Sequence, residues 1–300
     1  MQTRSRLREL RRNTDKYLML LPFTVLFLLF TVIPVLSSIA LSFTDYNMIQ
    51  PAAFVGWQNY SRMFLDDDVF FIAVRNTLVF ALITGPVSYL LCLMLAWMIN
   101  EFGRTVRTLL TFVFYAPSIS GTLYTVWAYI FSGDANGLFN SLLMRLGIIY
   151  EPVLWLSDTR YMLTVIIIVQ LWASLGTSFL SFIAGLQGVD RALYEAGTID
   201  GIRTRFQELR LITLPSMGPQ LMFAAVMQIG ASFGVSGICV ALAGNPSTDY
   251  AAATVVTHLS DVGTARYEMG YASAIATVLF LTMIGMNALI KRVLRKYTNI

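Results

Sequence analysis

The chain has 300 residues, of which 56% are hydrophobic and only 13% are charged, and its mean hydropathy is +0.66. A water-soluble domain usually carries about twice that charged fraction, so the composition excludes an ordinary soluble enzyme or binding module. The formal net charge of +4 fits anionic lipid headgroups and membrane orientation, and not nucleic acid. We expect an all-α polytopic membrane protein.

Six apolar runs are long enough to cross a bilayer, which requires about 20 apolar residues in a helix. In chain order they are Leu18–Phe43, Leu78–Ile99, Leu109–Phe131, Met162–Ala184, Pro219–Ala243 and Tyr271–Ile290. Arg-rich residues precede the first run, as in a secretory signal, but its apolar stretch is much longer than the roughly 7 to 15 residues of such a signal. The first helix is therefore expected to be retained.

These runs predict a tail over residues 1–17, a six-helix transmembrane domain over residues 18–290 and a second tail over residues 291–300. The domain includes one long polar connection, residues 190–215. When the connections are sorted by alternation, sixteen of the 21 Lys and Arg residues fall on the side of both tails and of this connection. Positive residues favour the cytoplasmic side, so both tails and residues 190–215 are expected in the cytoplasm.

Motifs for catalysis and for metal binding are not found in the sequence. A Walker A loop needs Gly before Lys, whereas Lys16, Lys291 and Lys296 follow Asp, Ile and Arg. His258 is the only histidine, which argues against a His-based metal site. We therefore expect no catalytic residue, no metal ligand and no ATP hydrolysis by the chain itself.

Other isolated polar residues have simple interpretations. Asp66-Asp67-Asp68 is expected to be a solvated acidic cap, because three adjacent carboxylates do not point at one centre. Cys92 and Cys239 lie within spans and are expected to be small apolar fillers. Ion-coupled transporters usually carry ionisable groups at membrane depth, whereas Arg75 stands at the outer rim of its span. A secondary transporter is disfavoured but kept as an alternative.

Residues 190–215 predict a helix, a turn and a second helix. Asp190 is a candidate N-cap, and Gly201 supplies the left-handed residue that ends the first helix. Thr204 stands three residues before Gln207, a capping-box spacing that opens the second helix. Pro215 is expected to break that helix. The pattern is also compatible with an ordinary amphipathic connection at the membrane surface.

This segment resembles the EAA loop of permease subunits of ABC importers. The matching residues are Glu195-Ala196-Gly197, Gly201 and Ile212-Thr213-Leu214-Pro215. Gly197 stands where Ala is commonest, and ten residues rather than the usual nine separate Gly201 from Ile212. Other residues resemble the carbohydrate branch of that family, near its larger maltose permease subunit: Asn76-Thr77-Leu78, Ala116-Pro117, Trp127, Gly137, Asn140, Trp155-Leu156-Ser157-Asp158, Trp172 and Ala184-Gly185-Leu186-Gln187.

The resemblance implies a Type I ABC importer permease in the cytoplasmic membrane of a bacterium. In this class the EAA loop forms a coupling helix that docks on a separate ATPase, which binds ATP and Mg²⁺, so the chain needs no cofactor of its own. The implied partners are a second, different six-span permease, two ATPase subunits and an extracytoplasmic solute-binding protein. The residues implied to couple to the ATPase are Glu195, Ala196, Gly197, Asp200, Gly201 and Arg203.

Polar residues on one face of two spans are candidates for the translocation path, because they recur at helical spacings of three or four. The candidates are Gln170, Ser174 and Thr177 on the fourth span, Gln228 and Ser232 on the fifth, and Trp172 and Tyr124 as stacking surfaces for sugar rings. Such residues also form hydrogen bonds between helices, and that alternative stays open. As a set they suit a neutral, hydroxyl-rich substrate; glycerol phosphate or a peptide is the alternative.

Overall fold

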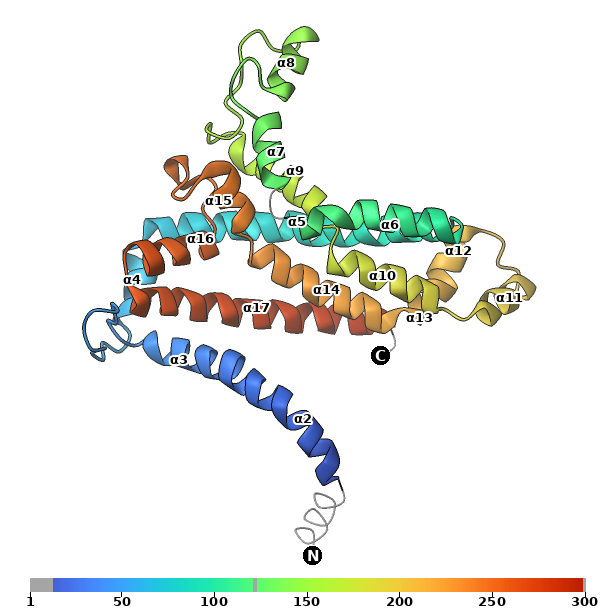
Figure 1. Ribbon diagram of the computed structural model, residues 1–300, viewed down its shortest axis with the longest axis horizontal. Helices are drawn as coiled ribbons and strands as arrows, with labels where there is room; N and C mark the ends of the chain where they lie inside the picture. Colours follow the sequence, from blue (N-terminus) through green and yellow to red (C-terminus); the bar gives the residue numbers. More distant parts are fainter. Residues whose placement is uncertain (1–12, 121–122, 299–300) are drawn as a thin grey trace, which may run out of the picture. The chain divides into compact units, whose positions relative to one another are not determined.

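The computed structural model describes residues 13–120 and 123–298, and within this range the regular secondary structure is helical apart from one isolated bridge between Thr44 and Phe54 (Figure 1). The all-α expectation is confirmed. Five helices are long and apolar enough to cross a membrane, and a bent pair of shorter helices would make a sixth span. The five are Asp15–Leu41, Asp68–Asn100, Met162–Gly188, Gly218–Ala243 and Met269–Val293, and the pair is Arg104–Ile119 with Tyr124–Ile130.

The expected third span, Leu109–Phe131, is therefore not one straight helix. It is divided between α6 (Arg104–Ile119) and α7 (Leu123–Ile130), whose directions differ by 85°. Pro117 lies in the last turn of α6, and Ser120 after it has extended backbone angles, so the helical hydrogen-bond ladder ends there. The length and hydropathy of the run do not reveal this bend.

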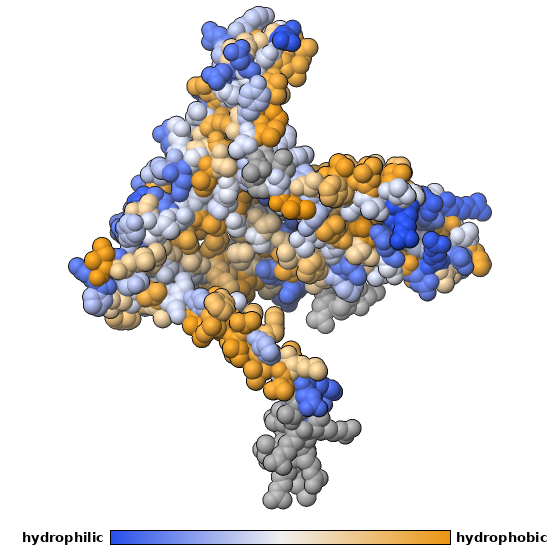
Figure 2. Space-filling view, in the orientation of Figure 1, coloured by the Kyte–Doolittle hydropathy of each residue, from blue (hydrophilic) through white to orange (hydrophobic). Residues whose placement is uncertain are grey.

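Contacts divide the chain into two compact units, and the smaller comprises residues 1–65 and 262–277. Its helices are α2 (Thr14–Phe27), the π-helical turn η1 (Leu28–Val32), α3 (Ile33–Leu41), α4 (Gln58–Leu65), most of η4 (Asp261–Ala265) and the first part of α17 (Met269–Thr298). The apolar side chains from α2 to α3 are exposed (Figure 2), as suits a lipid-facing helix. The Asn59 amide donates to the Ser42 carbonyl at 2.9 Å, and Arg62 pairs with Glu268 at 2.7 Å.

The larger unit comprises residues 66–261 and 278–300. Besides α6, α7 and the last part of α17, its elements are α5 (Asp68–Asn100), α8 (Leu138–Arg145), α9 (Met162–Ala173), α10 (Thr177–Gly188), α11 (Arg191–Ile199), α12 (Arg205–Glu208), η2 (Leu209–Thr213), α13 (Leu214–Ser216), α14 (Gly218–Phe233), α15 (Gly237–Ala243), η3 (Thr248–Tyr250) and α16 (Val255–Ser260).

Helices α5, α10 and α14 pack along one another and form the core of the larger unit (Figure 1). Small residues allow the close approach: a Cβ on Gly185 would lie 2.7 Å from Met217 Cε, and one on Gly85 would lie 3.4 Å from Ser232 Oγ. Phe179 and Phe182 of α10 are fully buried between the helices. Because lipid tails are as apolar as these side chains, close van der Waals contact, rather than transfer out of water, stabilises the packing.

The fourth expected span is interrupted at Ser174–Gly176, between α9 and α10, and the fifth at residues 234–236, between α14 and α15. At the first interruption the Cys92 thiol lies 3.7 Å from the Ser174 carbonyl, in position to donate a weak hydrogen bond. Backbone groups that leave a helical ladder inside a membrane need such partners or a polar cavity. The interruptions therefore bring polar backbone into the depth of these two spans.

The segment that joins α7 to α9 is held around Asn140, whose side chain is fully buried. Its Nδ2 donates to the carbonyls of Ser132, Asp134 and Val153 at 3.1 to 3.2 Å. Its Oδ1 accepts from the Val153 amide at 3.2 Å and from the Trp155 indole at 2.7 Å. The Asn140 side chain therefore connects residues 132–134 to residues 153–155, the two ends of the segment that contains α8.

The start of α5 is fixed by contacts with the segment before α17. The Asp67 carboxylate accepts from the Phe70 amide at 2.9 Å and so caps α5, and it lies 2.8 Å from Nε2 of the buried His258 on α16. The expectation of a solvated acidic cap is wrong for Asp67, whose side chain is only 12% exposed. The fold brings α16 beside the start of α5, and a pairing across that separation leaves no local pattern.

Candidate functional site

The first helix of residues 190–215 is closed at both ends by its own sequence. Asp190 accepts a hydrogen bond of 3.0 Å from the first turn of α11, as expected of an N-cap. Gly201 has φ +88°. The Ile202 amide donates to the Gly197 carbonyl at 2.9 Å, and the Gly201 amide donates to Thr198 at 3.2 Å. This is the Schellman arrangement, so the helix end lies where the sequence predicts it.

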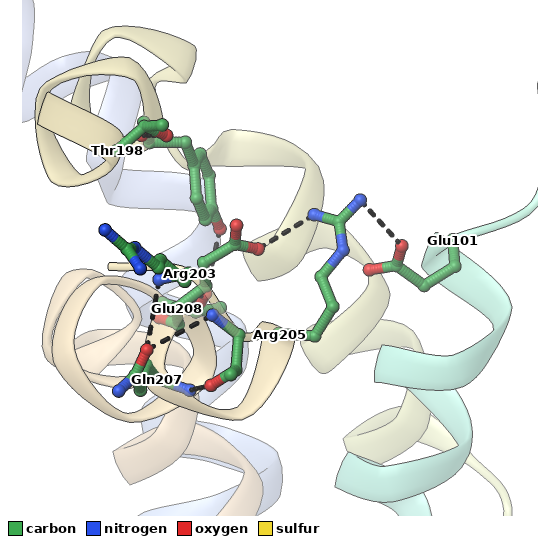
Figure 3. Close-up of polar contacts among 9 residues, drawn as sticks. Glu101, Thr198, Arg203, Arg205, Gln207 and Glu208 are labelled. Atoms are coloured by element: carbon green, nitrogen blue, oxygen red, sulfur yellow. Dashed lines mark hydrogen bonds and ion pairs between the residues drawn. The ribbon is translucent and has the colours of Figure 1, made fainter. Parts of the chain in front are cut away.

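The second helix begins with the expected capping box. The Thr204 hydroxyl accepts from the Gln207 amide at 3.2 Å, and the Gln207 side chain accepts from the Thr204 amide at 3.1 Å. The same side-chain oxygen accepts from the Arg203 amide at 3.0 Å. The turn between the two helices is therefore fixed at Arg203 and Thr204 by three hydrogen bonds to one short motif (Figure 3).

Pro215 does not break the second helix, contrary to expectation. The chain stays helical from α12 through the π-helical turn η2 to the end of α13, and the irregular angles come at Met217. In η2 the Leu214 amide donates to the Leu209 carbonyl, five residues back. Pro215 follows in the first turn of α13, where a missing amide hydrogen costs little.

The two helices are locked together by one tight apolar contact and one hydrogen bond. A Cβ on Gly197 would lie 2.6 Å from Ile212 Cδ1 and 3.1 Å from Ile202 Cδ1, so glycine is what lets these side chains close over α11. The Tyr194 hydroxyl lies 2.9 Å from the Thr213 hydroxyl. These contacts connect α11 to η2, which continues through α13 toward α14.

Five of the six residues predicted to couple to an ATPase are exposed, namely Glu195, Ala196, Asp200, Gly201 and Arg203, and Gly197 is buried. The same segment exposes large apolar side chains that the sequence reasoning missed. Ile199 is 87% exposed and Phe206 is 65% exposed. Exposed apolar groups among charged ones mark an interaction surface when they are clustered on one segment. Both residues stand beside charged neighbours in the sequence, Ile199 before Asp200 and Phe206 after Arg205, but apolar residues elsewhere in the connection do not distinguish them.

A polar cavity of about 610 Å³ lies between this segment and the end of α5. Its walls include Trp97 and Glu101 of the α5 end, Arg107 of α6, and Tyr194 and Glu195 of α11. Glu195 therefore borders the cavity as well as the exposed surface. The cavity is lined mainly by polar and charged groups, which suits contact with water better than contact with lipid tails.

Arg205 connects residues 190–215 to the end of α5 (Figure 3). Its guanidinium lies 2.8 Å from the Glu208 carboxylate and 3.5 Å from the Glu101 carboxylate. The hydrogen bond with Glu208 and the negative charge of Glu101 raise the pKa of Arg205, so it stays charged at any physiological pH. The sequence reasoning named neither Glu101 nor Arg205 as a site residue, although their opposite charges occur on two connections expected on the same side of the membrane.

The candidate path residues fall into two groups, and the first is buried in the core of the larger unit. Gln228 is 6% exposed and Ser232 is 4% exposed. The Ser178 hydroxyl of α10 lies 3.2 Å from the Ala224 carbonyl and 3.4 Å from the Gln228 side-chain oxygen. Ser232 donates to the Gln228 backbone carbonyl at 2.7 Å. Gln228 therefore contacts α10, the Ser232 hydrogen bond stays within α14, and both residues border a mainly apolar cavity of about 270 Å³ lined by α5, α14 and α17.

The second group surrounds the interruption between α9 and α10. Gln170 and Ser174 are half-buried, Thr177 is exposed, and Trp172 is 36% exposed. The Trp172 ring meets the Trp127 ring of α7 edge to face at 5.3 Å. The half-buried Tyr124 lies on the same short helix as Trp127. This group therefore combines accessible polar side chains, aromatic rings and a break in the helical backbone.

These features define a membrane-spanning protein with one exposed helix, α11, in its long polar connection. Residues 88–299 match the family described as the inner membrane component of binding-protein-dependent transport systems, and the chain belongs to this family. The predicted identity as an importer permease, a transport subunit rather than an enzyme, is confirmed. The match also confirms a multi-pass protein of the inner membrane.

Two curated relatives from Bacillus subtilis (strain 168) cover nearly the whole chain. The probable ABC transporter permease protein YesP is 32% identical over 93% of this chain and 89% of its own. The arabinooligosaccharides transport system permease protein AraP is 31% identical over 91% of this chain and 86% of its own.

A solved structure has the same fold. It is a chain of a bacterial alginate ABC transporter in complex with alginate pentasaccharide-bound periplasmic protein, with a TM-score of 0.79, 23% identity, and coverage of 97% of both chains.

Proposed function

We propose that this permease imports a neutral sugar or oligosaccharide delivered by an extracytoplasmic solute-binding protein. The proposal is supported by relatives named as permeases for arabinooligosaccharides and lactose. It is also supported by the chemistry of the accessible candidates, because Gln170, Thr177 and Trp172 offer hydrogen bonds and an aromatic face but no charge. A phosphorylated solute would favour Arg or Lys there.

The observation that carries the coupling role is the capped helix α11 with its exposed Ile199 and Phe206. We infer that this surface docks on an ATPase subunit, with Glu195, Asp200 and Arg203 as polar contacts at its rim. Two ATPase subunits bind ATP and Mg²⁺, and a second six-span permease completes the pore. Closure of the ATPases then moves α11, and the contacts of Gly197 with Ile212 and of Tyr194 with Thr213 carry this displacement into α14.

The orientation that this role requires places both termini and residues 190–215 in the cytoplasm, as the distribution of Lys and Arg indicates. The path is assigned to Gln170, Trp172, Ser174, Thr177 and Tyr124. Gln228 and Ser232 border a separate, mainly apolar cavity and would join the path only if transport rearranges α5, α14 and α17 around it. The interruption at Ser174–Gly176 supports the assignment, since broken helices commonly form substrate sites near the middle of a membrane.

The test is reconstitution of the complete transporter in proteoliposomes with its binding protein. We expect the loaded binding protein to stimulate ATP hydrolysis and labelled mono- or oligosaccharide to accumulate inside. Accumulation of glycerol phosphate or a peptide, with no sugar among a broad panel, would replace the substrate class. Accumulation driven by an ion gradient without ATP would overturn the importer assignment.

A further inference from the structure

The coupling segment, residues 190–215, meets the membrane helices at two separate places. One is the packed connection through η2 and α13 into α14. The other is the Arg205 guanidinium, which reaches across to Glu101 at 3.5 Å. Glu101 stands at the end of α5, where its amide donates to the Met98 carbonyl at 3.3 Å, and α6 begins at Arg104. Arg205 therefore contacts the turn that joins two other membrane helices.

The surroundings of this contact leave room for motion. The polar cavity of about 610 Å³ has α11 on one side and the end of α5 on the other. A packed apolar contact loses about a quarter to a half of its attraction when its surfaces separate by about 0.5 to 1 Å. An ion pair between long side chains weakens only gradually with distance, and its side chains adjust to a displacement. The Arg205 side chain is 68% exposed and that of Glu101 is 44% exposed, so both are free to do so.

Glu208 forms a second ion pair with Arg205. Its carboxylate lies 2.8 Å from the guanidinium, three residues further along the same helical segment, and its side chain is only 22% exposed. This second pair stays within the coupling segment, and the first pair crosses from the coupling segment to α5. Glu101 and Glu208 thus pair with the same Arg205 guanidinium (Figure 3). The Glu101 pair joins two elements, whereas the Glu208 pair lies within one.

We propose that Arg205 and Glu101 form a second coupling link, through which displacement of the coupling segment moves the α5–α6 turn together with α14. This inference rests on the proposed function, because it assumes that an ATPase displaces the segment. Arg205 and Glu101 are positioning residues: they contact neither substrate nor nucleotide. Exposed ion pairs contribute little to stability, so the role of this pair lies in keeping two elements together during motion.

The chain offers a matched control for the test. Glu101→Gln removes the pair between elements, and Glu208→Gln removes the pair within one helical segment, while Arg205 stays in both. The measurement is the number of sugar molecules imported per ATP hydrolysed in the reconstituted transporter, with the thermal stability of each complex as a second readout. We expect Glu101→Gln and Arg205→Gln to lower this ratio about threefold, the size of one surface ion pair's contribution, with stability unchanged. Glu208→Gln should stay near the unaltered ratio.

Exchange of the two charges separates the link from a local structural role. Glu101→Arg with Arg205→Glu, built in the Glu208→Gln background so that the new carboxylate does not face Glu208, should restore the ratio. An equal loss in Glu101→Gln and Glu208→Gln, or an exchange that restores nothing, would overturn the link. Failure of the unaltered transporter to import any sugar would instead count against the proposed function, so the two failures are distinguishable.

Discussion

Gly197 lies against Ile212 so closely that a Cβ on the glycine would come within 2.6 Å of Ile212 Cδ1. The contact joins the middle of α11 to the π-helical turn that leads into α14. The contact also explains why Gly197 stands where alanine is commonest in the family. Alanine at this position would need space that Ile212 and Ile202 occupy in this chain.

We expect Gly197→Ala to destabilise the coupling segment. Alanine favours a helix over glycine by about 0.5 to 1 kcal/mol, but overpacking costs about 1 to 3 kcal/mol, so the steric term decides the sign. Ile212→Val removes Cδ1 and should reverse it, making Gly197→Ala neutral or stabilising in that background. The measurement is retention of the ATPase on the purified permease for all four members of the cycle. Equal effects of Gly197→Ala in both backgrounds would contradict the packing argument.

The Asp67–His258 contact should be important for stability. Asp67→Ala removes the N-cap of α5, at about 1 kcal/mol, and leaves the buried His258 without its carboxylate, at about 1 to 3 kcal/mol. Thermal unfolding of the detergent-solubilised permease should therefore begin several degrees lower. Asp66→Ala is the control, because Asp66 is exposed and its removal should change little. Similar decreases in unfolding temperature in the two variants would contradict a specific stabilising role for Asp67.

Gln170 and Gln228 should respond differently to replacement by leucine. Gln228 lies in the α10–α14 contact beside Ser178, so Gln228→Leu should lower stability by about 1 kcal/mol with uptake per assembled complex near normal. Gln170 is more accessible, and Gln170→Leu should lower uptake about fivefold through one lost hydrogen bond to a sugar hydroxyl, with stability retained. Uptake normalised to purified complex separates the two effects. Normal normalised uptake in Gln170→Leu would remove this residue from the path.

The orientation of the chain predicts a labelling pattern. Single cysteines introduced at Ser5 and at Thr298, in a background with Cys92 and Cys239 changed to Ala, should react with a membrane-impermeant maleimide only after permeabilisation. A cysteine at Asp249 should react in intact cells. Reaction of position 249 only from the cytoplasmic side would invert the proposed topology.

Local hydrogen bonds explain which parts of the coupling segment were predictable. Asp190, Gly201 and the Thr204–Gln207 box act on backbone groups within a few residues, so their sequence spacing specifies the geometry. The behaviour of Pro215 was not predictable in this way, because the wide turn η2 before it has no local signature and supplies the position where proline fits. The sequence also showed that Gln228 and Ser232 share a face, but not that Gln228 meets Ser178 of α10 while the Ser232 hydroxyl bonds within α14.

Longer separations explain the remaining misses. Asp67 and His258 are 191 residues apart in the chain, and Glu101 and Arg205 lie on different connections between the membrane helices. Their pairing depends on the packing of α5 against α10 and α14, which periodicity does not determine. The bend between α6 and α7 was missed for a related reason: length and hydropathy count apolar residues, whereas the direction of a helix after a break is set by tertiary contacts.

The hydrogen bonds around Asn140 have a practical consequence for protein engineering. Because this side chain fastens residues 132–134 to residues 153–155, the chain beyond α8 forms a closed loop whose tip, residues 146–151, is largely exposed. Extra residues placed at Gly147, which already has φ +69°, would lengthen the tip without pulling on α7 or α9. The tip is therefore a suitable position for an epitope or a fluorescent tag on this permease. An insertion next to residues 132–134 or 153–155 would instead disrupt the Asn140 hydrogen bonds.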